Sequence, residues 1–132
     1  MRVIHVDSRS PESVGTSTAF LVNLATTIDS ERLRRIRVDG FRASSLPGYV
    51  DTVYLSCGLV SSVDLQGPFG NHDILLAVPV IAGAGAFSSG VEVWIDIPLC
   101  LCQSIDFKLR DQNGSIIDQS GVGFVTFSIT LS

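Results

Sequence analysis

The last forty residues of the chain alternate apolar and polar side chains with a period of two. The pattern covers three runs: 91–97 (VEVWIDI), 105–110 (IDFKLR) and 125–131 (VTFSITL). Successive side chains of a β-strand point to opposite faces of a sheet, so this spacing gathers the apolar residues on one face. A helix repeats every 3.6 residues and would scatter the same side chains around its surface. The three runs therefore predict strands that are buried on one face only.

The remainder of the chain also favours strands over helices. Residues 28–34 have the composition of one helical turn, which is too short to be stable alone. The polar segment 8–17 and the small-residue segment 82–90 have the composition of loops, and Asn113-Gly114 favours a type I′ hairpin turn. Residues 115–118 could form a short return strand. The further predicted strands are 2–7, 18–24, 35–42, 52–60 and 73–80. The last is nearly all apolar, as expected of a central strand that is covered on both sides or packed at an interface.

The number and spacing of these strands constrain the architecture. Eight or nine short strands in 132 residues predict one all-β domain that spans 1–132. Several loops are long enough to cross from one sheet to another, which favours a Greek-key or jelly-roll connection over a simple meander. We therefore expect a single jelly-roll β-sandwich of about eight antiparallel strands.

The charge and the hydropathy of the chain argue against several classes of partner. The net charge is −4 at pH 7, whereas a nucleic-acid-binding domain presents a basic face. No stretch reaches the roughly 18 apolar residues of a membrane span, and the start lacks the apolar core of a signal peptide. We expect no nucleic-acid partner, no membrane partner and no secretion through a signal peptide. Apolar residues make up 45% and charged residues 17% of the chain, which fits either a surface covered by a partner or closely packed strands.

The three cysteines give no sign of a disulfide framework. Cys100 and Cys102 lie two residues apart on a predicted strand and point to the same face, a poor geometry for bonding each other. With Cys57 the count is odd, which favours reduced thiols in an intracellular compartment. We interpret all three as small buried apolar residues.

No motif for catalysis or metal binding is present. The possible ligands His5, His72, Asp73, Cys100 and Cys102 lack the paired spacing of structural zinc sites. The Gly-Ala repeat at 83–86 leads into a predicted strand and not into the helix that a phosphate loop requires. We predict no metal, no cofactor and no catalytic residue. A small hydrolase remains a minor hypothesis, and it requires a pocket that contains His5 or His72.

The basic residues cluster in one segment. Five of the nine lysines and arginines lie at 32–42, flanked by acidic residues. This segment is either a solvated strand with internal ion pairs or a positive strip that docks on an acidic neighbour, such as another copy of the chain. Trp94 alternates with Val93 and Ile95, so it points outward, as an interface anchor or beneath a long loop. We predict that Arg34, Arg35, Arg37 and Trp94 are interface residues.

Both ends of the chain resemble a known group of proteins. Residues 4–10 (IHVDSRS) and 15–24 (GTSTAFLVNL), together with 105–118 (IDFKLRDQNGSIID) and 124–129 (FVTFSI), are similar to small single jelly-roll capsid proteins. These penton and minor capsid proteins occur in polinton-like viruses, adintoviruses, virophages and related large DNA viruses. The resemblance implies a jelly roll that associates with itself at a capsid vertex, as a pentamer or else as a trimer. It implies no catalysis and no cofactor.

Two functions of different classes follow. The first is a structural subunit of a viral or virus-derived shell, a homo-oligomer located in the virion with other capsid proteins as neighbours and assembled inside the host cell. The alternative is a jelly-roll binding module or spike head that recognises a glycan or a receptor through its loops.

Overall fold

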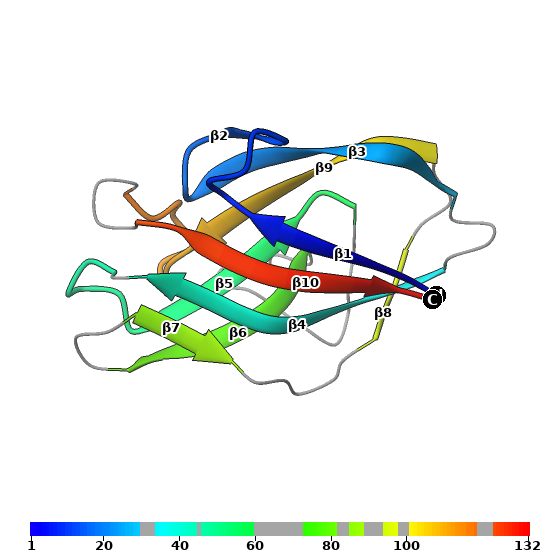
Figure 1. Ribbon diagram of the computed structural model, residues 1–132. Coiled ribbons are helices and arrows are strands. Elements are labelled where there is room, and N and C mark those ends of the chain that lie inside the picture. Colours follow the sequence, from blue (N-terminus) through cyan, green and yellow to red (C-terminus); the bar gives the residue numbers. More distant parts are fainter. Residues whose placement is uncertain are drawn as a thin grey trace.

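The computed structural model describes residues 1–29, 34–44, 46–59, 73–81, 85–88, 94–97, 101–118 and 123–132. Within these ranges the chain forms ten strands and no helix (Figure 1). The strands are β1 (Arg2–Asp7), β2 (Ser13–Gly15), β3 (Ala19–Asp29), β4 (Arg35–Ser44), β5 (Thr52–Cys57), β6 (Ile74–Ile81), β7 (Gly85–Ser88), β8 (Ile95–Asp96), β9 (Leu101–Arg110) and β10 (Val125–Leu131).

Eight of the ten described strands pair in a nested order. The outermost strands β1 and β10 pair, then β3 with β9, β4 with β7, and β5 with β6. These pairs follow one another along one long two-stranded antiparallel ribbon. Two further pairings, β10 with β4 and β9 with β5, fold this ribbon into two layers. Every one of these pairings is antiparallel. This nested and rolled order is that of a jelly roll, which confirms the predicted fold class.

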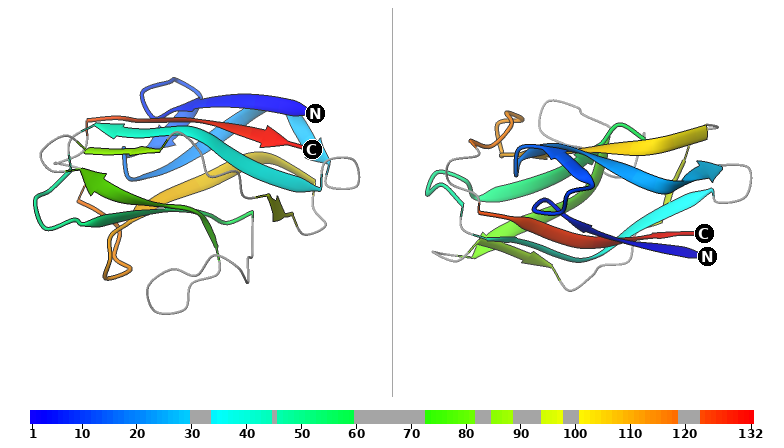
Figure 2. Two further views of the ribbon diagram at one scale, coloured as in Figure 1. Left: turned by 90° about the horizontal axis from the view of Figure 1, so that it is seen from below. Right: turned by 45° about the horizontal axis from the view of Figure 1, so that its top comes forward.

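The two layers form a sandwich and not a closed barrel. One sheet has the order β1-β10-β4-β7 and the other β6-β5-β9-β3-β2, and they lie one above the other (Figure 2). The end of β6 pairs with β7 through Val80 with Ala86 and Ile81 with Gly85, which joins the sheets along one edge. The short strand β8 pairs with the beginning of β4. We call the sheet that contains β1, β10 and β4 the first sheet, and the other the second sheet.

A row of four phenylalanine rings crosses the core from one sheet to the other. Phe20 on β3 packs on Phe107 on β9, with ring centroids 5.7 Å apart. Phe107 meets Phe127 on β10 edge to face at 5.0 Å, and Phe127 stacks on Phe41 on β4 at 6.1 Å. Aromatic pairs are favourable at centroid separations of about 4.5–7 Å. The row therefore connects both sheets at the centre of the sandwich.

Most of the predicted strands lie where alternation placed them. β1 and β10 have the predicted bounds, and the inward residues Ile36 and Val38 of β4 are buried. Cys57 is buried, as predicted. Cys100 lies outside the described residues, and Cys102 lies on β9 without a described side chain. In β6 the consecutive residues 74 and 75 are both buried, as expected for a strand covered on both sides, but residues 77 and 79 are exposed.

Several local predictions were wrong. The predicted loop 82–90 contains β7, and the predicted loop 8–17 contains β2. Residues 28–29 of the predicted helical turn belong to β3, and residues 30–33 lie outside the described residues. Glycine and alanine have low intrinsic strand preference, but β7 is paired on both sides, with β4 and with β6. In the predicted strand 91–97 only Ile95–Asp96 is a strand, and 91–93 lie outside the described residues.

The turn after β9 also differs from the prediction. A type I′ turn would place Asn113 and Gly114 at its centre. Instead, the Gly114 amide donates to the carbonyl of Asp111 at 3.0 Å, which centres the turn on residues 112 and 113. Gly114 has a φ of 82°, the left-handed conformation that follows a turn of this kind at a bulge. Residue 116 then forms only an isolated bridge with Arg110 and not a return strand.

The phenylalanine row yields a stability prediction. Phe107 is fully buried and packs on two other rings, so Phe107→Ala removes contacts in both sheets. We expect the free energy of unfolding, measured by urea denaturation, to fall by about 3–5 kcal/mol. The control Phe107→Leu keeps most of the apolar volume and should cost clearly less. A loss below about 1 kcal/mol for Phe107→Ala would contradict a central role of this ring.

Candidate interaction face

The outward side chains of β1, β10 and β4 form one face, polar apart from exposed Val3 on β1, which we call the outer face. Strand register fixes which residues stand side by side, because directly opposed residues in an antiparallel pair share a face. β10 lies between the other two strands and supplies the middle residue of each row. The face therefore consists of three rows across the sheet: Val3–Thr130–Arg37, His5–Ser128–Asp39 and Asp7–Thr126–Arg42.

The first cluster on this side of the sandwich is built around Trp94, which we call the Trp94 cluster. The pairing of β8 with β4 brings the indole beside the start of β4. The guanidinium carbons of Arg35 and Arg37 lie 4.9 Å and 4.7 Å from the ring centroid. Ile95, the next residue along, is buried in the core, so Trp94 points away from the core as predicted. The ring is half-buried and serves as a platform for two cations.

Arg34 completes the group of predicted residues at this end of β4. Its amide donates to the carbonyl of Ser132 at 2.9 Å, and its carbonyl accepts from the amide of Ile97 at 2.7 Å. These backbone bonds hold it between the end of the chain and the segment that carries Trp94. Its side chain is exposed. The structure therefore brings Arg34, Arg35, Arg37 and Trp94 together, whereas Arg32 lies outside the described residues.

The ion-pair interpretation of the arginine-rich segment holds for Arg37, while docking on a neighbour stays a prediction. Arg37 forms an ion pair with Asp39 at 3.1 Å, and the Thr130 hydroxyl donates to the same carboxylate oxygen at 3.2 Å. This arginine belongs to a local network. Arg34, Arg35 and Arg42 have no carboxylate partner among the described residues, so part of the positive charge is available to another molecule.

A second cluster lies at the opposite end of β4, and sequence reasoning missed it. The guanidinium carbon of Arg9 lies 4.0 Å from the centroid of the Phe124 ring, and that of Arg42 lies 5.7 Å from it. We call Arg9, Phe124 and Arg42 the Phe124 cluster. The available signal was strand alternation, since the inward residues Val125 and Phe127 place Phe124 on the outward side.

Asp7 holds Arg9 in place within this cluster. Both carboxylate oxygens of Asp7 accept from the Arg9 guanidinium, at 3.0 Å and 2.8 Å, and one also accepts from the Arg9 amide at 2.9 Å. This two-pronged contact fixes the plane of the guanidinium group. The same contact lowers the pKa of the Asp7 carboxyl. Arg9 is thus ordered from one side by a carboxylate and from the other by an aromatic ring.

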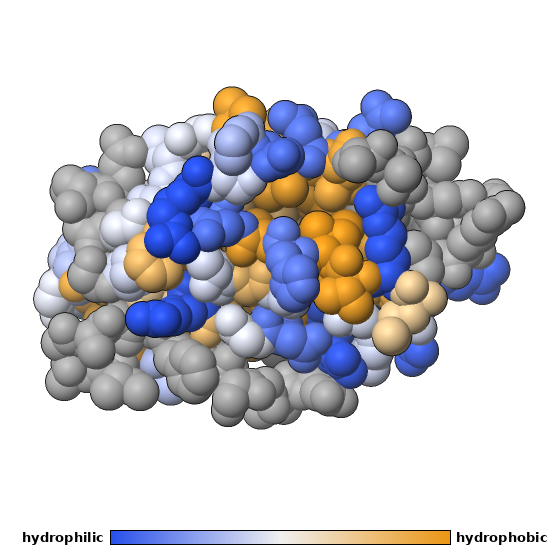
Figure 3. Space-filling model, viewed as in Figure 1, coloured by the Kyte–Doolittle hydropathy of each residue, from blue (hydrophilic) through white to orange (hydrophobic). Residues whose placement is uncertain are grey.

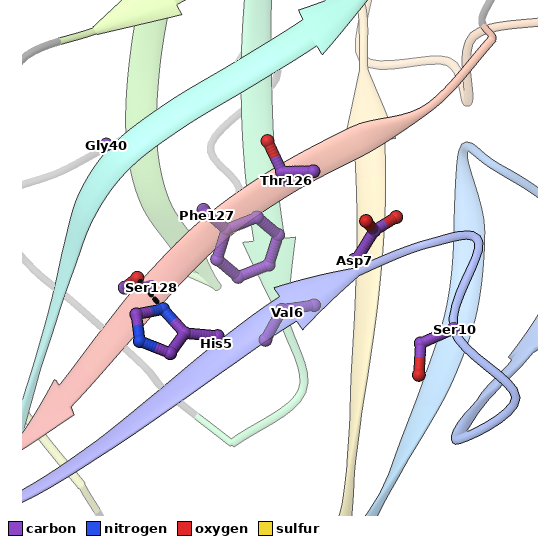
Figure 4. A pocket seen from close by; sticks show the side chains of 8 residues that line it. All are labelled: His5, Val6, Asp7, Ser10, Gly40, Thr126, Phe127 and Ser128. Carbon is purple, nitrogen blue, oxygen red and sulfur yellow. Dashed lines mark hydrogen bonds between the residues drawn. The ribbon is translucent and has the colours of Figure 1, made fainter.

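A hollow of about 390 Å³ lies on the outer face near the centre of β1 and β10 (Figure 4). Gly40 is one of its lining residues, and a Cβ atom at this position would meet no other atom within 4 Å. Gly40 has a φ of 62°, and the register of β4 against β10 shifts at this point. The volume is at the lower end of the range of small-molecule sites, about 300–1,000 Å³. The polar lining consists of His5, Asp7, Ser10, Thr126 and Ser128, with Val6 and Phe127 also contributing.

The hollow contains the histidine that the hydrolase hypothesis requires. His5 Nδ1 and Ser128 Oγ are 2.6 Å apart and hydrogen-bonded (Figure 4). A nucleophilic serine also needs a group that orients the histidine and donors for the oxyanion. In the described part of the chain, no carboxylate accepts a hydrogen bond from His5. Position 72 lies outside the described residues. The absence of catalytic residues stays a prediction.

The described residues offer no assembled metal site. No group of three or more histidine, cysteine, aspartate or glutamate side chains comes together in them to hold a metal ion. Of the possible ligands named from the sequence, His72 and Cys100 fall outside these residues. A helix that could cross a membrane is also not found in the described ranges.

Comparison with known proteins does not assign a family. No protein-family model matches the chain, and no curated protein sequence matches it. The fold by itself does not fix a function, because jelly rolls serve many. Function therefore has to be argued from the outer face and its charges.

The Asp7–Arg9 contact predicts a shifted titration. In a carbon-detected NMR titration we expect the Asp7 carboxyl to titrate below its ordinary pKa of 3.8, and Arg9→Gln to move it back up. Because the folded-state pKa is lowered, the contact stabilises the fold above the ordinary pKa and is lost as the pH falls through the lowered value. The Glu12 carboxyl, whose pKa is lowered by the Ser10 hydroxyl, serves as an internal control that should not move. An unchanged Asp7 pKa in Arg9→Gln would refute this assignment.

The pair His5–Ser128 gives a test of catalysis. If the pair is structural, wild-type protein and the variant Ser128→Ala should hydrolyse an activated ester, such as p-nitrophenyl acetate, at the same slow rate. His5→Gln tests the histidine in the same assay. A drop of tenfold or more in both variants would establish a working nucleophile and base and overturn the prediction that the protein is not an enzyme.

Proposed function

We propose that this protein is a structural subunit of a viral or virus-derived shell that assembles into a homo-oligomer. A pentamer at a shell vertex is favoured and a trimer is the second possibility. Its neighbours are copies of itself and other capsid proteins, it resides in the virion, and it is assembled inside the host cell. Three observations support the proposal: the nested strand order, the resemblance of both chain ends to penton and minor capsid proteins, and the charge of the outer face.

The charge of the outer face carries the proposal. The chain is acidic overall, with a net charge of −4, yet five arginines lie on or beside this one face. Asp7 and Asp39 pair with two of them, and exposed Asp96 stands opposite Arg35, which leaves five positive against three negative charges. A surplus of positive charge on one face of an acidic protein is complementary to other surfaces of the same protein. A second copy of the chain is therefore a suitable partner.

The two aromatic rings make these arginines suitable for docking. A long flexible side chain loses conformational entropy when a partner immobilises it, about 0.5–1.5 kcal/mol for each such side chain. Arg35 and Arg37 already lie over Trp94, and Arg9 already lies over Phe124. Part of this entropy is lost on folding and not on binding. Arginine also presents a planar fork that pairs with a carboxylate through two hydrogen bonds.

The hollow at His5 and Ser128 favours the alternative function, a binding module, but with the ligand on the sheet face and not at the loops. Its lining is rich in hydroxyl groups, and Arg9 neutralises the Asp7 carboxylate, so it suits an uncharged polar ligand such as a glycan. In this alternative the protein need not associate with itself. The two functions therefore differ in the mass that they predict for the purified protein.

Charge reversal at the Trp94 cluster tests the proposed assembly. We expect Arg35→Glu/Arg37→Glu to weaken self-association by at least tenfold, because it places two negative charges where the partner presents carboxylates. The measurement is size exclusion with light scattering over a dilution series, with circular dichroism to verify the fold. The control Arg35→Lys/Arg37→Lys keeps the charge and loses only the planar fork, so it should retain most of the oligomer. An unchanged oligomer in the Glu variant excludes this interface.

A further inference from the structure

A second surface of the molecule carries exposed apolar side chains and carboxylates, which complement the arginines of the Phe124 cluster. It lies where the loop between β4 and β5 meets the turn after β9, and we call it the acidic turn surface. Each of the two segments exposes a large apolar side chain, Tyr49 by 54% on the loop and Ile116 by 44% after the turn. Two exposed carboxylates, Asp51 and Asp118, accompany them. Exposed apolar groups next to acidic ones are typical of a site that binds a basic and partly apolar partner.

Hydrogen bonds hold this surface in one shape. Gln112 connects the two segments: its side-chain oxygen accepts from the Asp51 amide at 3.1 Å, and its side-chain nitrogen donates to the Tyr49 carbonyl at 2.7 Å. The buried carboxylate of Asp111 accepts from the amides of Asn113 and Ser115, which closes the turn. A surface that is ordered before binding loses little entropy on docking.

The acidic turn surface and the Phe124 cluster lie at the same end of the sandwich but on different sides of it. The Phe124 cluster belongs to the first sheet, at the end of β4 and the beginning of β10. The turn after β9 projects beyond β5 and β6, on the side away from β1 and β10 (Figure 2). Figure 3 shows the face that carries β1 and β10, with strongly polar surface at the end where β10 begins.

We propose that the Phe124 cluster of one copy docks on the acidic turn surface of the next copy. Arg42 has no carboxylate partner among the described residues, and Asp51 has no ion-pair partner among them. Arg42 of one copy and Asp51 of the next can therefore form an ion pair. The Phe124 ring faces Tyr49 and Ile116, so the contact combines apolar burial with paired charges. This contact rests on the proposed self-assembly and identifies a surface on each side of it.

The placement of the two surfaces determines the kind of assembly. The contact is heterologous, since each copy contributes two different surfaces and has one of each left for another neighbour. Heterologous contacts produce a ring if the rotation between copies closes and an open filament if it does not. Both surfaces lie at one end of the sandwich, so successive copies share that end, which favours a closed ring.

A charge swap tests the contact. We expect Arg42→Glu alone and Asp51→Lys alone each to weaken self-association at least tenfold, measured by sedimentation velocity over a dilution series. The double variant Arg42→Glu/Asp51→Lys restores opposite charges across the contact and should recover most of the affinity. The controls Arg42→Lys and Asp51→Glu keep the sign of each charge and should assemble like the wild type.

The outcomes separate this contact from the proposed function. If the wild type assembles and neither single reversal weakens it, or if the double variant is as weak as the two single effects combined, this contact is overturned while self-assembly stands. If the wild type is monomeric throughout the dilution series, both proposals fail. Loss in each single variant with recovery in the double variant establishes the contact.

Discussion

The pairing of the first strand with the last is the constraint on which the rest of the structure depends. β1 and β10 are joined along their whole length, from Arg2 with Leu131 to Asp7 with Thr126. Closing so long a loop costs free energy that grows only with the logarithm of its length, so a complete ladder of strand pairing can offset it. Once the ends are joined, the other pairs nest inside them. β10 then lies between β1 and β4 and creates the outer face.

The outer face gains its features from contacts between segments that are distant in sequence. Arg9 reaches Phe124 across more than one hundred residues, and Trp94 lies under arginines that precede it by more than fifty. Gly40 adds a local feature, because its left-handed backbone accompanies the shift in register that opens the hollow. The face thus combines an ordered positive charge at each end with a polar depression between them. A partly charged sheet face of this kind is suited to contact with another protein surface.

Much of the fold could be predicted from the sequence, for a clear physical reason. The alternation of apolar and polar residues depends only on which side chains are buried in the core. β1, β4 and β10 therefore lie where this pattern predicted them. β7 was missed because Gly85 and Ala86 have low strand preference, and this strand depends on pairing with its two neighbours. The hairpin turn was misassigned because the carbonyl of Asp111, and not that of Gln112, accepts the hydrogen bond that closes it. The candidate site was likewise predicted only in part. The sequence indicated the four residues at the Trp94 end, whereas Phe124 and the hollow depend on strand register.

The central claim is that the outer face of an acidic jelly roll binds further copies of the same chain. The structure supplies arginines ordered by aromatic rings, and the chain supplies carboxylates elsewhere on its surface. Sedimentation equilibrium of the unmodified protein, from micromolar to several hundred micromolar, tests this most directly. We expect a defined oligomer, a pentamer or else a trimer, that dissociates at raised ionic strength because its contacts are ionic. A protein of 14.1 kDa that remains a monomer at the highest concentration would contradict it.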